Sequence, residues 1–292
     1  MKNKTVTELA PAKVNLTLSV GHKRPDGYHD LLTLMETVSL CDILTVKPEE
    51  SLLPEIKLSI CGKYRVPEDR TNLVVRAAEA YFVASDERFS VSVSLEKNIP
   101  TEAGLGGGSA DAAAMLRALN RIVDRPLPTN ELSELAASLG ADVAFCLFGG
   151  TAVCTGIGER LEQVSVPARR FYTVVMGKER VSTPNAYRAL DQNREEIGKI
   201  PPIPQKNDLI ALARGEIRPL ANDFETVVFP EHPGIAERKA RLLSLGATDA
   251  LMSGSGAAVF GVFPDENSAK QAADAFDDED AFAVSTVAQY YR

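Results

Sequence analysis

A glycine-rich stretch that runs into a helical pattern constrains this chain more than any other feature. Residues 100–111 have the sequence Pro-Thr-Glu-Ala-Gly-Leu-Gly-Gly-Gly-Ser-Ala-Asp. Glycine adopts backbone conformations that are closed to other residues, and the first amide groups of a helix have no partner within the helix. These amides and the helix dipole attract an anion, so we expect this loop to bind phosphate and not to serve as a plain linker.

Two common classes of glycine loop do not fit this stretch. A Walker A loop ends in Gly-Lys-Ser or Gly-Lys-Thr, whereas Ser109 follows Gly108 directly. A Rossmann fingerprint needs a strand that leads straight into the glycines and a third glycine where this chain has Ser109, but residues 98–102 intervene after the predicted strand. The loop is therefore of another class.

The periodicity around the loop predicts an α+β protein, and the length of 292 residues agrees with two domains. We expect strands over residues 14–20, 31–40, 43–46, 57–61 and 91–95. We expect helices over residues 72–84, 109–123 and 130–139, with Ser109 as an N-cap and Gly140 as a left-handed end. A second α+β unit starts near residue 160, with strands over 171–176, 247–252, 258–263 and 282–288 and a helix over 268–276.

Charge and composition exclude several classes of partner and site. The chain has 32 basic and 40 acidic residues, and its net charge of −8 disfavours binding to the nucleic-acid backbone. Residues 1–7 are polar and no run approaches the ~20 apolar residues of a membrane span, so we expect a soluble, unexported, cytoplasmic protein. Four cysteines without a Cys-x-x-Cys pair lie in apolar segments and are expected to be buried and reduced. Three histidines without metal-binding spacing argue against a histidine metal centre.

The loop and four further motifs resemble the GHMP kinases, named for galactokinase, homoserine kinase, mevalonate kinase and phosphomevalonate kinase. The further motifs are Ala-Pro-Ala-Lys-Val-Asn-Leu at 10–16, Arg-Pro-Asp-Gly-Tyr-His at 24–29, Gly-Ala-Asp-Val-Ala-Phe at 140–145 and Ser-Gly-Ser-Gly at 253–256. They follow one another in the family's order and span nearly the whole chain. They also narrow the resemblance to the branch whose substrate is a cytidine diphosphate-linked methylerythritol.

This resemblance implies a fold and an activity. The fold would be α+β, with a GHMP kinase ATP-binding domain over residues 1–160 that is similar to domain 2 of ribosomal protein S5. A ferredoxin-like C-terminal domain would follow over residues 161–292, and ATP would meet the substrate between the two. The activity would be transfer of the ATP γ-phosphoryl group to the 2-hydroxyl of the methylerythritol unit, in the non-mevalonate isoprenoid pathway. Mg²⁺ would accompany ATP, and the partner would be this small molecule.

The resemblance also assigns the catalytic and nucleotide-binding residues. Asp142 would accept the proton of the hydroxyl, and Lys13 would stabilise negative charge beside it; the residues alone leave open a strand-edge surface charge for Lys13 and a helix N-cap for Asp142. Lys97 is expected near the nucleotide, and Ser109 is a candidate magnesium ligand. The residues expected to bind ATP are Pro100, Thr101, Glu102, Ala103, Gly104, Leu105, Gly106, Gly107, Gly108, Ser109 and Ala110.

For the substrate, the resemblance implies that Tyr28 and Tyr187 stack on opposite faces of the cytosine ring and that His29 hydrogen-bonds to it. Without the family, half-buried aromatic packing is the favoured interpretation of both tyrosines. Asn15 and Thr183 would contact the polar part of the substrate. The motif at 253–256 would be a second glycine turn near the cleft, which a tight turn between two strands would also explain.

Two alternatives follow from the same residues. A GHMP kinase acting on another alcohol, such as mevalonate or homoserine, would have no base to stack on Tyr28 and Tyr187. A nucleotide-binding protein without catalysis would not need a carboxylate beside a cation, as Asp142 and Lys13 provide. The kinase for the cytidine-linked alcohol is therefore the prediction that accounts for the most motifs.

Overall fold

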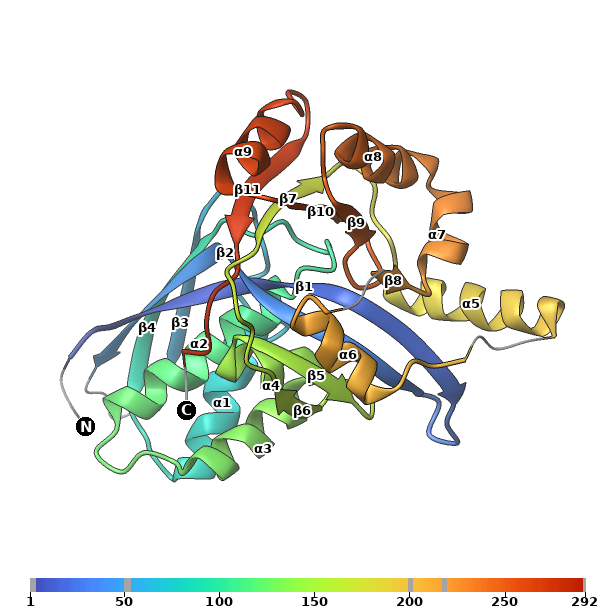
Figure 1. Ribbon diagram of the computed structural model, residues 1–292. Coiled ribbons are helices and arrows are strands. Elements are labelled where there is room, and N and C mark those ends of the chain that lie inside the picture. Colours follow the sequence, from blue (N-terminus) through green and yellow to red (C-terminus); the bar gives the residue numbers. More distant parts are fainter. Residues whose placement is uncertain (1–3, 50–53, 199–201, 217–219, 291–292) are drawn as a thin grey trace.

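The computed structural model describes residues 4–49, 54–198, 202–216 and 220–290, so the first three residues of the polar N-terminal stretch lie outside it. The N-terminal half contains strands β1 (Val6–Lys23), β2 (His29–Glu49), β3 (Ile56–Gly62), β4 (Ser90–Lys97), β5 (Thr151–Thr155) and β6 (Arg160–Gln163). Its helices are α1 (Leu73–Ser85), α2 (Gly107–Ile122), α3 (Thr129–Leu139) and α4 (Ala141–Phe148). Figure 1 shows these helices gathered on one face of the sheet.

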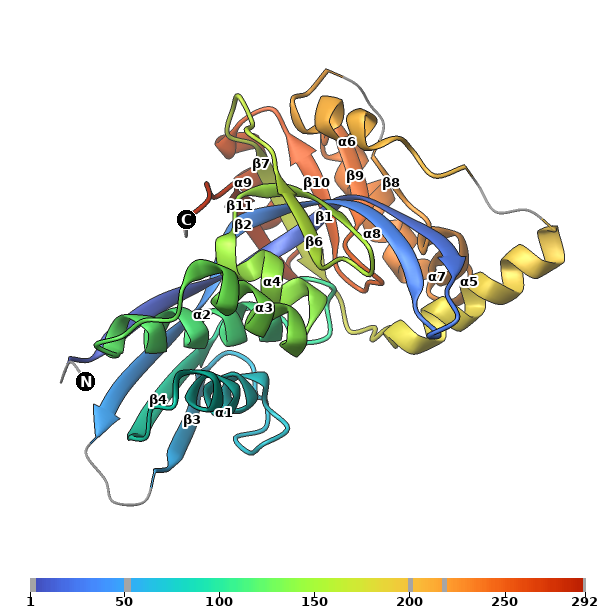
Figure 2. The same ribbon diagram turned by 90° about the horizontal axis from the view of Figure 1, so that it is seen from below.

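The N-terminal sheet is built around a long antiparallel ribbon of β1 and β2. The pairing runs from Val6 opposite Val46 to Lys23 opposite His29, with three register shifts. The strand order is β3-β4-β2-β1-β8, where β8 (Ala221–Asn222) comes from the C-terminal half, and β5 pairs with β2 and with β6. Figure 2 shows the ribbon extending from the N-terminal helices to the C-terminal half. Residues at the middle of β1 therefore face both halves of the molecule.

The C-terminal half has the ferredoxin-like topology that the resemblance implied. Its sheet is antiparallel in the order β11-β7-β10-β9, and the chain passes strand, helices, strand, strand, helix, strand. The strands are β7 (Phe171–Met176), β9 (Asp249–Met252), β10 (Val259–Phe263) and β11 (Asp280–Ser285). The helices are α5 (Thr183–Ile197), α6 (Lys206–Ala213), α7 (Glu225–Glu231), α8 (Pro233–Ser244) and α9 (Glu266–Asp274). The predicted α+β fold is confirmed.

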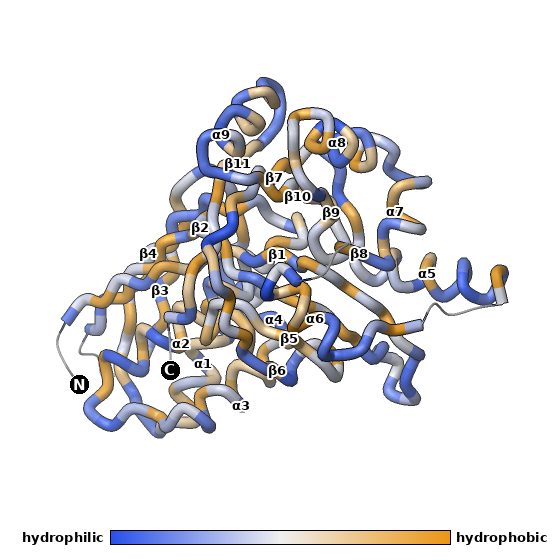
Figure 3. The backbone as a smooth tube through the Cα atoms, in the orientation of Figure 1, coloured by the Kyte–Doolittle hydropathy of each residue, from blue (hydrophilic) through white to orange (hydrophobic). Residues whose placement is uncertain are grey.

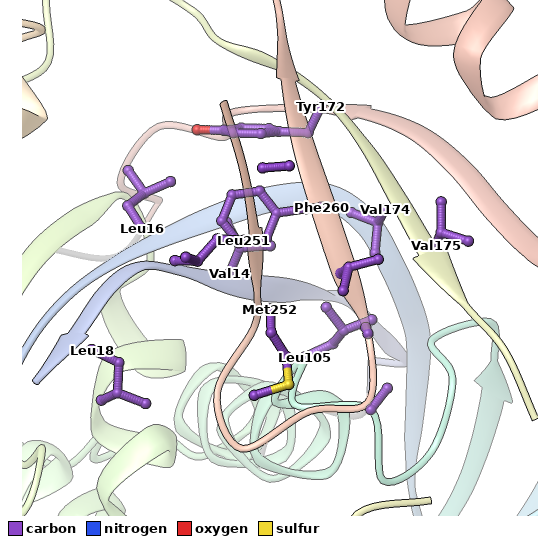
Figure 4. Packing of buried hydrophobic residues seen from close by; sticks show 14 of the residues in the cluster. Val14, Leu16, Leu18, Leu105, Tyr172, Val174, Val175, Leu251, Met252 and Phe260 are labelled. Carbon is purple, nitrogen blue, oxygen red and sulfur yellow. The ribbon is translucent and has the colours of Figure 1, made fainter. Parts of the chain in front are cut away.

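The two halves share one hydrophobic core. Side chains of β1 pack in one cluster with side chains of the C-terminal sheet, as Figure 4 shows for Val14, Leu16, Phe260 and Leu251. The short strand β8 (Ala221–Asn222) of the C-terminal half also pairs in parallel with β1 at Thr17 and Leu18. In Figure 3 the tip of the β1–β2 hairpin is hydrophilic, while hydrophobic segments follow the central strands. The division at 160/161 stays a prediction; sheet membership changes between β6 and β7.

One buried carboxylate, that of Glu36, is hydrogen-bonded to residues of both halves. Glu36 on β2 is fully buried and accepts hydrogen bonds from Thr151 Oγ1 at 2.7 Å, Arg170 Nη1 at 2.5 Å and the Tyr172 hydroxyl. Thr286 Oγ1 also donates to it at 3.1 Å. Because a charged group in an apolar core is stable only when it is paired and hydrogen-bonded, these donors hold the two sheets together at this point.

Thr151→Val tests this network, because valine has nearly the same shape but no hydroxyl. A hydrogen bond to a charged acceptor contributes about 1.5–3 kcal/mol, so we expect the free energy of unfolding to fall by that amount in urea denaturation. Thr7→Val is the matched control, since it removes an exposed cross-strand hydrogen bond to Thr45 and should cost no more than about 0.5 kcal/mol. Equal losses in the two variants would contradict the role given to Glu36.

Several local predictions were wrong. The helix after the glycine loop begins at Gly107 with Gly106 as its N-cap, so Ser109 is not the cap. Strands predicted over 31–40 and 43–46 are one strand, β2. Gly140 has an extended backbone with φ of 164°, not a left-handed one. Of the cysteines, Cys146 and Cys154 are buried, but Cys41 is half-buried and Cys61 is exposed. Within the described ranges, no helix is both long and apolar enough to cross a membrane.

Candidate active site

Three adjoining cavities follow the junction of the two halves. The middle cavity, of about 240 Å³, is lined by Lys13, Asn15 and Asp142. It shares Gly104 and Gly106 with a cavity of about 510 Å³ that residues 100–109 line, whereas Ala110, also predicted to bind ATP, is buried in the N-terminal core. On its other side it shares Leu31, Ile157, Thr183 and Tyr187 with a cavity of about 700 Å³ that contains Tyr28 and His29. The glycine-rich loop and the pocket that contains Tyr28 and His29 are therefore connected through a small space lined by Lys13, Asn15 and Asp142.

Lys13 is the charged centre of this middle space. Its side chain comes from β1 and only 4% of the residue is exposed, so it is not a surface charge at a strand edge. Its Nζ donates to Asn15 Oδ1 at 2.7 Å and lies 3.4 Å from Asp142 Oδ2. Asn15 is fixed in turn by donating to Thr33 Oγ1 at 2.9 Å. The ammonium group has a third hydrogen, which these two partners leave for a bound group.

Asp142 comes from the first turn of α4, a helix that the sequence interpretation missed. The N-cap of α4 is Gly140, so Asp142 is not itself the cap. Its side chain is 35% exposed and lines the middle cavity. A carboxylate in the first turn is favoured by the helix dipole. The carboxylate is thus placed beside a buried cation but remains accessible to a ligand.

The glycine-rich loop is held against both Lys13 and the C-terminal half. The Lys13 amide donates to the Leu105 carbonyl at 3.0 Å. A Cβ on Gly106 would lie 3.0 Å from Lys13 Cγ, so the lysine stem runs directly along this glycine. Ser253 Oγ donates to the Gly104 carbonyl at 2.9 Å, and the Ala258 amide donates to the Ala103 carbonyl at 3.1 Å. The turn at 253–256 therefore supports the loop from the opposite side.

Beneath the loop lies a buried charged cluster of Asp42, Lys97 and Asp111. Lys97 Nζ donates to Asp111 Oδ2 at 2.7 Å and to Asp42 Oδ2. Asp42 Oδ1 also accepts from the amides of Asn98 and Ile99 at 2.5 and 2.8 Å. Burial raises the pKa of Asp111 well above its ordinary value, more than Lys97 lowers it. Since Lys97 precedes the loop and Asp111 follows it, the cluster ties both ends of the loop together.

The cavity lined by the glycine-rich loop offers a metal two carboxyl groups, those of Glu102 and Asp111, and the hydroxyl of Ser109. Ser109 lines it, as do Lys97 and Asp111, and the Oδ1 atom of Asp111 is buried without a hydrogen-bond partner. In the part of the chain that the structure covers, no three His, Cys, Asp or Glu side chains form a metal cluster. This donor set fits an ion such as Mg²⁺ that is held mainly by phosphate oxygens and water.

The third cavity brings Tyr28, His29, Thr183 and Tyr187 together. Tyr28 is 60% exposed, so it is not a half-buried core aromatic. His29 is buried, and its ring stacks on Tyr187 with centroids 5.0 Å apart and an interplanar angle of 20°. Phe224 meets the Tyr187 ring edge-on at 4.8 Å. Burial, and secondarily the Asp142 carboxylate, raises the pKa of Tyr187 to about 12, so its hydroxyl stays neutral at physiological pH.

The structure thus gathers the predicted residues along one continuous space, and it adds residues that the sequence interpretation missed. Asp191 accepts from His29 Nε2 at 2.8 Å, and its spacing from Thr183 and Tyr187 in steps of four residues could have revealed it. Asn222 donates to the carbonyls of Met252 and Gly254 at 2.8 and 2.7 Å and supports the second glycine turn. Thr183 Oγ1 lies 2.7 Å from Ser255 Oγ of that turn. No local pattern in the sequence marks Asn222.

Comparisons with known proteins agree with this architecture. The model of the GHMP kinases N terminal domain matches residues 72–150, and that of the GHMP kinases C terminal region matches residues 205–280. A 4-diphosphocytidyl-2-C-methyl-D-erythritol kinase from Geobacter sulfurreducens is 40% identical over 271 residues, covering 93% of this chain and 94% of that protein. The protein of that name from Geotalea daltonii is 38% identical over 286 residues, covering 97% and 99%.

Solved structures give the same result. The crystal structure of a 4-(cytidine 5'-diphospho)-2C-methyl-D-erythritol kinase superposes with a TM-score of 0.82 at 40% identity, covering 96% of this chain and 99% of that one. Mevalonate kinase from L. major superposes with a TM-score of 0.73 at 11% identity over 100% and 99% of the two chains. At that identity the second match shows a shared fold alone.

Proposed function

This chain belongs to the GHMP kinases, in the branch of the 4-diphosphocytidyl-2-C-methyl-D-erythritol kinases, and we propose that phosphoryl transfer takes place beside Lys13 and Asp142. The enzyme phosphorylates the 2-hydroxyl of that compound with ATP, a step of the non-mevalonate isoprenoid pathway. The observation that supports the proposed site is that the Lys13–Asp142 pair lies in the small space between the loop-lined cavity and the aromatic cavity.

In this proposal ATP binds in the cavity of about 510 Å³, with its phosphates at the loop. The amides at the start of α2 and the dipole of this 16-residue helix would attract the phosphate oxygens. Gly104 and Gly106 line both this cavity and the middle one, so the terminal phosphate would reach the middle space past these two residues. A Cβ at Gly104 would overlap the Ser253 carbonyl, and a Cβ at Gly106 would press on the Lys13 side chain, so neither position has room for a side chain.

Asp142 would act as the general base, and Lys13 would stabilise the charge that develops. As the substrate oxygen forms its bond to the γ-phosphorus, the bond from that phosphorus to the bridging oxygen of ADP breaks. The proton of the hydroxyl passes to an Asp142 carboxylate oxygen. Lys13, held by Asn15, keeps one N–H for the transferred group, and a fixed, almost fully buried cation stabilises such charge strongly.

The cytidine end of the substrate would occupy the cavity of about 700 Å³. Tyr28 and Tyr187 supply aromatic faces and His29 a hydrogen-bonding ring, while Thr183 and Asn15 lie towards the reacting end of the substrate. Stacking tolerates any base, so hydrogen bonds must provide the selectivity. Mevalonate and homoserine carry no base and would leave this cavity empty.

Mg²⁺ bound with ATP would neutralise phosphate charge, and Ser109 is the protein group that we propose as its ligand. We further propose a cytoplasmic location, since ATP is a cytoplasmic metabolite, and no role in nucleic-acid binding, since the net charge is −8. The predicted domain division at 160/161 falls within β6, which pairs with β5, so we propose that the division lies between β6 and β7.

An assay of ADP release tests the assignment. With ATP, Mg²⁺ and 4-diphosphocytidyl-2-C-methyl-D-erythritol we expect turnover, and with mevalonate or homoserine under the same conditions we expect none above background. Removal of the metal with EDTA should abolish turnover, and added Mg²⁺ should restore it, because phosphoryl transfer depends on the cation that accompanies the nucleotide. Turnover of mevalonate or homoserine at a rate equal to that of the cytidine compound would contradict the proposed use of the aromatic cavity.

A further inference from the structure

One face of helix α5 carries three residues that meet the aromatic cavity. Thr183, Tyr187 and Asp191 are four residues apart, so they lie on the same side of the helix, and all three line the cavity of about 700 Å³. Figures 1 and 2 both show α5 beside the far end of the β1–β2 hairpin, where His29 begins β2. The face of α5 that carries these three side chains is therefore turned towards His29, the residue that we propose to recognise the base.

The orientation of the His29 ring is set by two of these residues. Its Nε2 lies 2.8 Å from Asp191 Oδ1, and its plane stacks on Tyr187. Only 6% of His29 is exposed. A half-turn of the ring about its Cβ–Cγ bond would keep its plane against Tyr187 but would bring a carbon in place of Nε2 towards Asp191, so the hydrogen bond holds the ring in this orientation. The position of the second nitrogen, Nδ1, is therefore fixed as well.

Asp191 also determines which nitrogen carries the hydrogen. Its Oδ2 accepts a hydrogen bond from Lys23 Nζ at 2.9 Å. Partial burial acts to raise the pKa of Asp191, but hydrogen bonds from Lys23 and His29 outweigh it and lower that pKa below its ordinary value. The group is thus a carboxylate, which only accepts hydrogen bonds. The contact with His29 consequently requires a hydrogen on Nε2, and in the neutral ring Nδ1 is left as an acceptor.

We propose that Asp191 is a positioning residue that holds His29 with its hydrogen on Nε2, so that Nδ1 accepts a hydrogen bond from the 4-amino group of cytosine. The proposal rests on the proposed function, because it concerns the base of that substrate. Uracil has a carbonyl oxygen where cytosine has the amino group. Two acceptors would then face each other in a half-enclosed site, and leaving such groups unpaired disfavours uracil about 10- to 100-fold.

Asp191→Asn reverses the hydrogen-bond pattern while keeping the size of the side chain. Lys23 only donates, so the new amide oxygen turns towards Lys23 and the NH₂ group towards His29. The amide would then donate to Nε2 and move the ring hydrogen to Nδ1. We expect kcat/KM for the cytidine substrate to fall about 10- to 100-fold, mainly through KM, and the uridine-linked analogue to lose less or nothing. The ratio of kcat/KM for the two compounds is the readout.

Lys23→Met is the matched control, because it removes the other partner of Asp191 and leaves the carboxylate facing His29. It should retain the wild-type preference for cytidine over uridine. If Asp191 only fastened α5 to the hairpin, Asp191→Asn would change both compounds by the same factor, and that result would overturn the proposal. Wild-type enzyme that fails to turn over the cytidine compound would instead refute the proposed function, so the two failures are distinguishable.

A direct measurement covers the case in which Asp191→Asn does not fold. The chain has only three histidines, His22, His29 and His232, so ¹⁵N-histidine NMR of the wild-type protein at neutral pH can resolve them. His29→Gln identifies the signals of His29 by their loss. The proposal requires a hydrogen on Nε2 and none on Nδ1. A hydrogen on Nδ1, or on both nitrogens, would overturn the proposal.

Discussion

Asp142→Asn is expected to lower kcat by about 10²- to 10⁴-fold, the usual contribution of a general base, with KM for both substrates within about threefold of wild type. Asparagine keeps the size of the side chain and can still meet Lys13, but it cannot accept a proton from the substrate hydroxyl at neutral pH. Its position in the first turn of α4 adds only a helix-dipole effect, so we expect a loss of no more than about 1 kcal/mol of unfolding free energy. Steady-state kinetics and thermal denaturation measure the two quantities.

Glu131→Gln is the matched control for this variant. Glu131 is an exposed carboxylate in the first turn of the preceding helix, α3, and it lines none of the three cavities described above. It should retain wild-type kcat and lose a similar, small amount of stability. A general base ordinarily contributes more than about tenfold to kcat. If Asp142→Asn lowered kcat by less than about tenfold, Asp142 would only form an ion pair with Lys13 and would not be the base.

Gly104→Ala is expected to destabilise the enzyme by about 2–6 kcal/mol, the sum of a left-handed alanine and an overpacked contact. The backbone at Gly104 has φ of +74°, and a Cβ there would lie 2.0 Å from the carbonyl oxygen of Ser253. The added Cβ and the Ser253 carbonyl oxygen cannot rotate away from each other, so the loop and the turn at 253–256 would have to separate. We expect a lower midpoint in urea denaturation and a weakened affinity for ATP, measured by calorimetry on the folded fraction.

Gly108→Ala provides the comparison within the same loop. Gly108 lies inside α2 and does not have a positive φ, and the nearest atom to an added Cβ is Leu73 Cδ1 at 3.7 Å. Because alanine is favoured over glycine in a helix by about 0.5–1 kcal/mol, this variant should be as stable as wild type or slightly more so. If Gly104→Ala and Gly108→Ala lowered the free energy of unfolding by similar amounts, the close approach between Gly104 and Ser253 would not be the cause of the loss.

The parts of the fold that could be predicted from sequence are those with local causes. The glycines at 104–108, the helix that follows them and the strands of the ferredoxin-like half have signals in composition and periodicity. Helix α4 has no such signal, because its eight residues include only one charged side chain and an apolar run of that length is equally compatible with a strand. Serine is a common N-cap, so the sequence predicts Ser109 in that position, whereas Gly106 with φ of +68° turns the chain into the helix.

The catalytic pair could be named only through the family resemblance, because its partners are distant in sequence. Lys13 and Asp142 are 129 positions apart, and the sequence alone left a surface lysine and a capping aspartate equally open. The cluster of Asp42, Lys97 and Asp111 depends on three elements meeting under the loop, which periodicity cannot show. Asp191 could have been proposed as a partner of Tyr187, since a spacing of four residues places two side chains on one face of a helix.

The strand that carries Lys13 and Asn15 has its neighbouring side chains, Val14 and Leu16, in the apolar layer of the C-terminal sheet. Loosening of that sheet would thus shift the ammonium group and its amide partner together, although the sheet itself touches neither substrate. Turnover should therefore respond to damage in the C-terminal half before the helix content of the protein does. Partial unfolding of that half would abolish activity while most of the secondary structure remained.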